Sequence, residues 1–155
     1  MLAFNRKTDY ALISLAHLFR NPNTCCSARE LSKRYGMPLP LLMNVLKQLA
    51  SRGIIRSERG PRGGYQLAVP AEQVTLHDVI VAVDGPVALV QCLELAVGKN
   101  GRGSRNHGCD LSRTCPVQRN IHRIHRRLVD FLKSLTLVDI ASTADKPTEL
   151  PSLTY

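Results

Sequence analysis

Cysteines and long apolar runs are both scarce in this sequence, and each shortage excludes a class of protein. Five cysteines among 155 residues are far below the density of a disulfide-stabilised scaffold. No apolar stretch reaches the roughly eighteen residues of a membrane span, and residues 1–7 lack the apolar segment of a secretory signal. We therefore expect a cytoplasmic protein with no membrane partner, whose cysteines are metal ligands, sensors or buried side chains.

Acidic residues are also few, and they are unevenly distributed. The chain has 12 Asp and Glu against 21 Lys and Arg, a net charge of +9. Residues 1–70 hold 11 of the basic residues and only 3 of the acidic ones, so that residues 71–155 are close to neutral at +1. Such segregation predicts a first half that meets a polyanion and a second half with another role.

The basic half contains the pattern of three helices. Apolar residues are dense from Thr8 until residues 21–23, and Ser27 followed by Glu30 has the spacing of a capping box at the start of a short second helix. Gly36 ends that helix, and apolar residues at helical spacing predict a third helix over residues 38–52. The second and third helices have the proportions of a helix-turn-helix.

A hairpin follows the third helix directly. Residues 54–59 and 65–69 have strand patterns on either side of a turn at residues 60–64. We therefore predict a mainly α fold with a small β-hairpin wing, in which a winged helix-turn-helix domain is joined to a long dimerisation helix. The predicted DNA contacts are polar residues of helix 38–52 and basic residues of the wing: Asn44, Lys47, Gln48, Arg56, Arg59 and Arg62.

The second half of the chain predicts a dimer. Thr75 has the position of a helix cap, a glycine-rich stretch over residues 98–114 predicts a mobile loop, and apolar residues spaced four and three apart predict a helix over 117–135. The apolar seam of that helix has two possible partners, a second copy of the chain or its own winged domain. We divide the chain into a DNA-binding domain (1–70), a region with a helix, a cysteine loop (92–115) and the dimerisation helix (71–142), and a disordered tail (143–155).

Three motifs carry a resemblance to a known family. The wing sequence RGPRGGYQL (59–67), the opening TDYAL (8–12) and the spaced cysteines resemble the IscR and NsrR family of winged-helix regulators, over about residues 3–142. The resemblance implies a homodimer that binds a pseudo-palindromic operator, and in many members an iron–sulfur cluster is the sensor. We therefore expect a transcriptional repressor, not an enzyme, controlled by nitric oxide, redox state or iron supply.

The resemblance also implies cluster ligands. Cys92, Cys109 and Cys115 match the three cysteine positions of the family, although the gap between the first two is longer than is usual there. Thiolates are the usual ligands of iron–sulfur clusters. Three of them leave one coordination position, and either a 2Fe-2S or a 4Fe-4S cluster is compatible with the pattern.

The fourth ligand has two candidates. IscR-like members use a histidine three residues after the last cysteine, where this chain has Gln118, whereas NsrR-like members use the acid of the Thr-Asp motif, which is Asp9 here. Asp9 could be supplied by the other subunit, or could simply be an acid that interacts favourably with a helix start. His107, two residues before Cys109, is the second candidate because imidazole also binds iron.

Other cysteines and histidines suggest competing functions. We expect Cys25 and Cys26 to be small buried side chains, and His122 and His125 to lie on a basic helix face rather than to form a zinc site with Cys115. A thiol or zinc enzyme using Cys115 and His122 is disfavoured because no second catalytic constellation accompanies them. The remaining alternative is a cluster-free dimeric regulator that responds to a metabolite or a protein partner.

Overall fold

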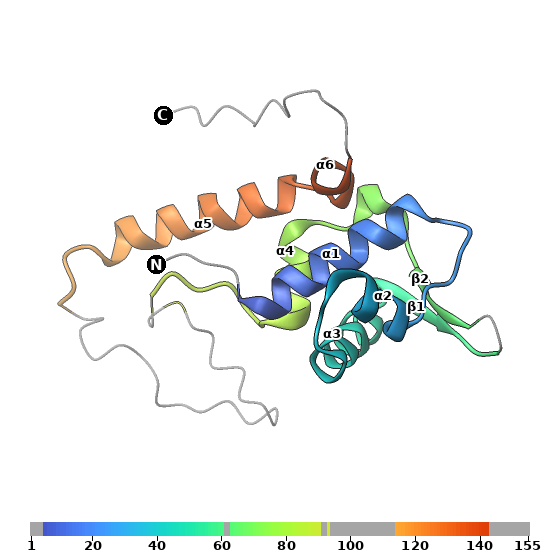
Figure 1. Ribbon diagram of the computed structural model, residues 1–155. Coiled ribbons are helices and arrows are strands. Elements are labelled where there is room, and N and C mark those ends of the chain that lie inside the picture. Colours follow the sequence, from blue (N-terminus) through green and yellow to red (C-terminus); the bar gives the residue numbers. More distant parts are fainter. Residues whose placement is uncertain (1–4, 61–62, 91–92, 94–113, 143–155) are drawn as a thin grey trace.

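The computed structural model describes residues 5–60, 63–90, 93 and 114–142 (Figure 1). Six α-helices, one 3-10 helix and two strands occur in these ranges, in the following order: α1 (Arg6–Arg20), α2 (Ala28–Tyr35), α3 (Leu39–Ser51), β1 (Ile55–Glu58), β2 (Gly64–Leu67), η1 (Ala71–Gln73), α4 (Leu76–Val83), α5 (Gln118–Ser134) and α6 (Leu137–Ala141). No helix in this part of the chain combines the length and hydropathy of a membrane span.

The helix-turn-helix is formed by α2 and α3, as predicted. Ser27 caps α2: its Oγ accepts a hydrogen bond from the backbone N–H of Glu30 (3.2 Å), and its own N–H donates to the Glu30 carboxylate (2.7 Å). Gly36 ends α2 in the left-handed conformation (φ +65°), which glycine adopts without steric cost. The chain therefore turns within a few residues and starts α3.

The hydrophobic core lies where α1, α2 and α3 meet. Leu15 of α1 and Leu31 of α2 are fully buried against the apolar stripe of α3. The stripe consists of Leu42, Val45, Leu46 and Leu49, each with 0% exposure. Complete burial of four aliphatic side chains fixes which face of α3 points inward, and so fixes which face points to solvent.

The core does not end at residue 70. Val74, Val79 and Leu137 are buried in the same cluster as the winged-helix residues. Backbone hydrogen bonds also join the start of α4 to the end of α5. The N–H of Leu76 donates to the carbonyl of Leu135 (2.8 Å), and the N–H of Leu137 donates to the carbonyl of Val74 (2.7 Å). The division predicted at residue 70 thus separates regions of different charge within one packed core.

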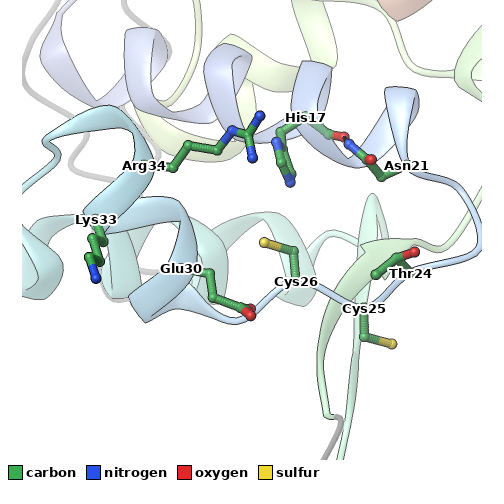
Figure 2. Close-up of a pocket in the computed structure, with 8 residues that line it drawn as sticks. All are labelled: His17, Asn21, Thr24, Cys25, Cys26, Glu30, Lys33 and Arg34. Carbon is green, nitrogen blue, oxygen red and sulfur yellow. Dashed lines mark hydrogen bonds between the residues drawn. The ribbon is translucent and has the colours of Figure 1, made fainter.

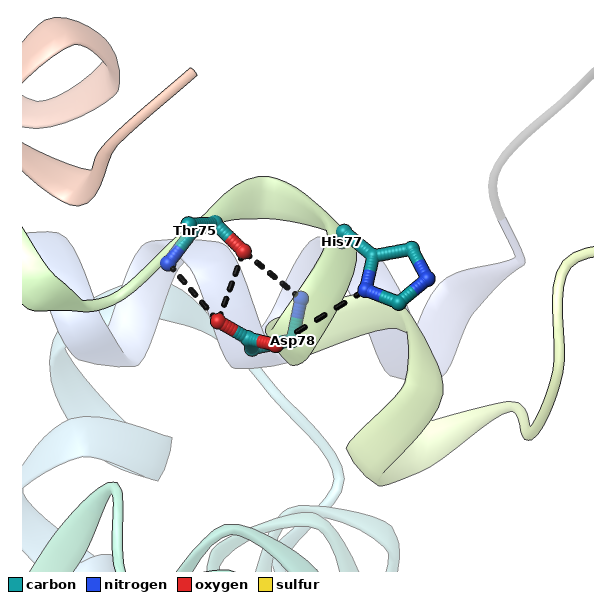
Figure 3. A network of polar contacts seen from close by, with 3 residues as sticks. All are labelled: Thr75, His77 and Asp78. Atoms are coloured by element: carbon teal, nitrogen blue, oxygen red, sulfur yellow. Dashed lines mark hydrogen bonds and ion pairs between the residues drawn. The ribbon is translucent and has the colours of Figure 1, made fainter. Parts of the chain in front are cut away.

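Capping boxes start both helices that extend this core. The Thr75 hydroxyl accepts a hydrogen bond from the N–H of Asp78 (3.1 Å) and donates to its carboxylate (2.6 Å) at the start of α4 (Figure 3). Thr136 and Asp139 make the same arrangement at the start of α6. The helix start that the sequence predicts at Thr75 is present, and the capping box of α6 was not foreseen.

The wing is a two-stranded antiparallel hairpin that projects from the helices (Figure 1). Its strands pair Ile55 with Leu67 and Glu58 with Gly64. Cys26, in the segment before α2, exchanges two backbone hydrogen bonds with Tyr65 (3.0 and 2.8 Å), so that the base of β2 is also attached to the helices. This attachment limits how the wing can move relative to α2 and α3.

Helix α5 uses its apolar stripe in two ways. Near its C-terminal end, Leu128 and Leu135 of the stripe are partly buried and pack with Leu132 against Leu76 and Ile80 of α4. Near its N-terminal end, Val117 and Ile124 are 53% and 52% exposed, and in Figure 1 this end reaches beyond the body of the molecule. The C-terminal part of the stripe therefore packs within its own chain, and the N-terminal part leaves an apolar surface open.

Substitution of Gly64 tests the attachment of the wing. A Cβ at this position would lie 2.6 Å from the carbonyl carbon of Cys26 and 2.7 Å from its oxygen, so Gly64→Ala must push β2 away from that segment. We expect a loss of about 1–3 kcal/mol in the free energy of unfolding, measured by urea denaturation. The exposed neighbour Ser57→Ala is the control and should cost much less; equal stability of Gly64→Ala and wild type would contradict this packing.

Candidate nucleic-acid interface and metal-binding residues

The solvent-facing side of α3 is polar and basic. Asn44 and Lys47 are exposed one turn apart, on the face opposite the buried stripe. Gln48 is half-buried, and its Oε1 atom is buried with no hydrogen-bond partner in the described part of the chain. Three side chains of this helix are predicted to contact DNA. Asn44 and Lys47 face solvent, whereas Gln48 packs against the rest of the protein.

The wing carries charge of both signs. Arg56 forms an ion pair with Glu58 on the same strand (3.3 Å), and Gln66 of β2 donates a hydrogen bond to the same carboxylate (3.2 Å). Arg59 follows β1 directly and is exposed, with no ion pair among the described residues. Arg62 lies outside the described residues. Arg59 is thus the more available cation, since Arg56 already has a carboxylate partner.

Asp9 lies in the first turn of α1 on the solvent side. Its carboxylate has no hydrogen bond or ion pair with the residues that the structure describes, so it is free to accept a cation or a metal. Because it follows Asn5, whose side chain caps the helix, its negative charge also lies near the favourable end of the helix dipole. Both interpretations of Asp9 that the sequence leaves open are compatible with this position.

The residue before Asp9 links α1 to the end of α4. Thr8 is fully buried, and its hydroxyl donates a hydrogen bond to the Asp84 carboxylate (2.6 Å), to which the Asn5 side-chain amide also donates. Asp84 is the C-cap of α4, and the chain continues from it toward Cys92. This network fixes the start of α1 beside the segment that leads into the predicted cysteine loop.

Sequence reasoning did not find the Thr8–Asp84 contact. The two residues are 76 positions apart, and neither belongs to a periodic pattern that would indicate the other. Only Thr8 carried a signal, as part of the Thr-Asp motif.

Of the predicted metal ligands, the structure describes Asp9 and Cys115. Cys92, Cys109 and His107 lie outside the described residues. Cys115 is a free, half-buried thiol just before α5. Among the described residues, no group of three or more His, Cys, Asp and Glu side chains could hold a metal ion.

A separate hollow of ≈ 570 Å³ lies between α1, α2 and the segment before α2 (Figure 2). Cys26 is buried beside it and Cys25 is half-buried, so the prediction of buried side chains holds fully for Cys26 alone. Burial raises the pKa of the Cys26 thiol, and the Glu30 carboxylate raises it further. Burial and the Arg34 cation lower the pKa of His17. Both groups are therefore neutral at pH 7, and Cys26 is a poor metal ligand.

The helix-turn-helix, the exposed polar face of its second helix and the attached hairpin together define a winged-helix DNA-binding protein. Residues 4–143 match the Rrf2 family, described as iron-dependent transcriptional regulators. The chain belongs to this family. It is a DNA-binding transcriptional regulator and not an enzyme.

Individual relatives agree with this assignment. The regulator IscR of Klebsiella pneumoniae is 28% identical over 140 residues, which cover 90% of this chain and 79% of that protein. The structure of CymR, the global cysteine regulator of B. subtilis, is 25% identical, covers 94% of this chain and 100% of that one, and superposes with a TM-score of 0.69. T. potens IscR is 20% identical with a TM-score of 0.66 over 94% and 93% of the two chains, which shows a shared fold.

Replacement of Thr8 tests the link between α1 and α4. Thr8→Val keeps the shape of the side chain but removes the hydroxyl that donates to Asp84. We expect the free energy of unfolding to fall by about 1–2 kcal/mol, because a hydrogen bond from a buried hydroxyl to a charged carboxylate is lost. Asp84→Ala removes the acceptor instead, and in that background Thr8→Val should cost much less. If Thr8→Val costs as much in Asp84→Ala as in wild type, the hydrogen bond does not stabilise the fold.

Proposed function

We propose that the chain binds a pseudo-palindromic operator as a homodimer and represses transcription, with its DNA affinity set by an iron–sulfur cluster. The observation that carries the DNA part is the orientation of α3. Its apolar stripe is fully buried, so Asn44 and Lys47 are presented together to solvent. In this proposal α3 enters the major groove, where Asn44 contacts a base edge and Lys47 a phosphate.

The wing would supply further backbone contacts. Arg59 is exposed at the end of β1, and the hairpin projects beside the helix-turn-helix (Figure 1). An arginine at such a position reaches flanking phosphates or the minor groove. Arg56 must exchange its Glu58 partner for a phosphate before it can contribute equally to DNA binding. Arg62 and Gln48 remain predicted contacts.

Exposed apolar residues of α5 support a homodimer. Val117 and Ile124 belong to the predicted seam and are about half exposed in the single chain. Burial of such side chains against a second copy would stabilise the dimer by roughly 25 cal/mol for each Å² of apolar surface removed from water. A two-fold axis between two winged domains would place two α3 helices on equivalent half-sites, which is why we propose a pseudo-palindromic operator.

For the cluster, the donor chemistry of the chain is suitable. Cys92, Cys109 and Cys115 would supply thiolates, and Asp9 of the partner subunit or His107 would supply the fourth ligand. Of the described candidates, Cys115 is a free thiol and Asp9 has no competing partner. The description of the family as iron-dependent supports an iron cofactor. A cluster of this kind reacts with nitric oxide and oxygen and depends on iron supply.

The position of Asp9 offers a route from sensor to DNA. Asp9 belongs to α1, and the buried face of α1 packs through Leu15 against the same core as α3. Thr8 holds this helix to Asp84 at the end of α4. A ligand held or released at Asp9 therefore acts on a helix that is rigidly packed against the proposed DNA-reading helix.

The salt dependence of DNA binding tests the interface. Each lost phosphate contact should lower the slope of log affinity against log salt concentration by about 0.9. We expect Lys47→Ala and Arg59→Ala each to flatten the slope measured by fluorescence anisotropy with operator DNA. Lys133→Ala, on the last turn of α5, is the control with an equal change of charge. An equal slope for all four proteins would exclude α3 and the wing as the phosphate-binding surface.

Spectroscopy of anaerobically purified protein tests the cluster. Wild type should show the visible absorption and Mössbauer signals of sulfide-linked iron. Cys109→Ala should lose them because a thiolate ligand is removed, and Asp9→Ala should alter them. Cys25→Ala removes a thiol outside the proposed ligand set and should leave the spectra unchanged.

The outcomes separate the two regulatory hypotheses. A colourless wild-type protein would overturn the cluster proposal. If Cys109→Ala also bound DNA like wild type, the cluster-free regulator that responds to a metabolite or protein partner would be favoured. Loss of the spectrum in Cys25→Ala would show that the ligand set is wrong.

A further inference from the structure

One large apolar side chain is exposed on the proposed DNA-reading face. Val117, Met43 and Ile124 are the most exposed large hydrophobic residues in the described part of the chain, at 53%, 52% and 52%. Two of the three belong to the α5 seam, for which a second copy of the chain is the proposed partner. Met43 belongs to α3 and needs a different explanation.

Met43 adjoins the polar side of α3. It precedes Asn44 in sequence and lies one helical turn before Lys47, so all three share the solvent side of α3. The apolar stripe of the same helix is on the opposite side and fully buried. On its other side Met43 adjoins the first turn of α3, where Leu39 is half-buried and Pro40 is exposed. Met43 therefore lies at the boundary between that turn and the polar side of the helix.

The position of Met43 along the helix indicates which kind of chemical group it contacts. It is in the N-terminal half of α3, which begins at Leu39, and residues in that part of a recognition helix are those that approach base edges. The edges of bases in the major groove are polar except for one group, the C5-methyl of thymine. An exposed apolar side chain next to a base-reading amide and one turn before a phosphate-binding cation matches that group.

We propose that Met43 is a specificity-determining residue that contacts the C5-methyl group of a thymine in each half-site. This inference rests on the proposed binding of DNA by α3. Methionine is unbranched and flexible, so its methyl and sulfur can follow the thymine methyl without displacing the helix. Asn44 beside it can pair bidentately with adenine, so each half-site should contain A·T pairs at the positions that these two residues contact.

The test removes only the methyl group from the DNA. Full-length wild-type protein first selects its preferred duplexes from a random pool. Each retained thymine is then replaced by deoxyuridine, which differs by the C5-methyl alone. Replacement of the contacted thymine in one half-site should weaken wild-type binding about four-fold, the factor for burying one methyl group. Replacement in both half-sites should weaken it about fifteen-fold.

A Met43 variant tests the protein side of the same contact. Met43→Ala should bind the thymine and deoxyuridine duplexes equally, because the apolar partner of the methyl is gone. Its salt dependence should stay that of wild type, since no phosphate contact is lost. Ile13→Ala removes apolar surface from an exposed residue of α1 and should keep the wild-type preference for thymine.

Three results would overturn the inference, and they are distinct from failure of the proposed function. The retained half-sites could contain no thymine, deoxyuridine could bind as well as thymine, or Met43→Ala could keep the preference for thymine. In each case wild type still binds and selects DNA. If wild type selected no sequence at all, the proposed role of α3 in operator binding would itself be wrong, and the role of Met43 with it.

Discussion

The burial of one side of α3 is the constraint on which the rest of the molecule depends. Four aliphatic side chains of this helix are fully excluded from water beneath α1 and α2. Rotation of α3 about its axis would expose them, at a cost of several kcal/mol by area. The helix is therefore held at one rotation angle, and the polar side chains on its other side start from a fixed backbone. In the proposed function, a fixed helix loses little conformational entropy when it binds DNA.

Part of the positive charge on the wing is balanced by a carboxylate of the wing itself. Glu58 is the acceptor for both Arg56 and Gln66, so part of the positive charge is already balanced before any nucleic acid arrives. An exposed ion pair of this kind contributes little to stability. In the proposed interface its effect is on binding, because a phosphate must compete with a carboxylate for Arg56.

The sequence predicted what depends on neighbouring residues. The capping box at Ser27, the helix cap at Thr75, the turn at Gly36 and the stripe of α3 all arise from residues a few positions apart, and each is present. Contacts between distant segments were beyond such reasoning. The Thr8–Asp84 hydrogen bond has no local signature. Periodicity along α5 also could not show that its C-terminal end packs on α4 and its N-terminal end does not. The cysteine pattern suggested ligands, but sulfur atoms far apart in sequence are brought together only by tertiary structure.

The inclusion of α6 in the core has a consequence for how the chain is made. Ala141 is almost fully buried, and its carbonyl accepts two hydrogen bonds from the guanidinium of Arg20 (3.2 and 3.1 Å) across 121 positions of sequence. While the ribosome is still synthesising the second half, the helix-turn-helix lacks part of its packing. The core beneath the proposed DNA-reading helix is completed only after residues 137–141 have emerged. A chain truncated before residue 137 would thus lack part of the packing that holds this helix in place.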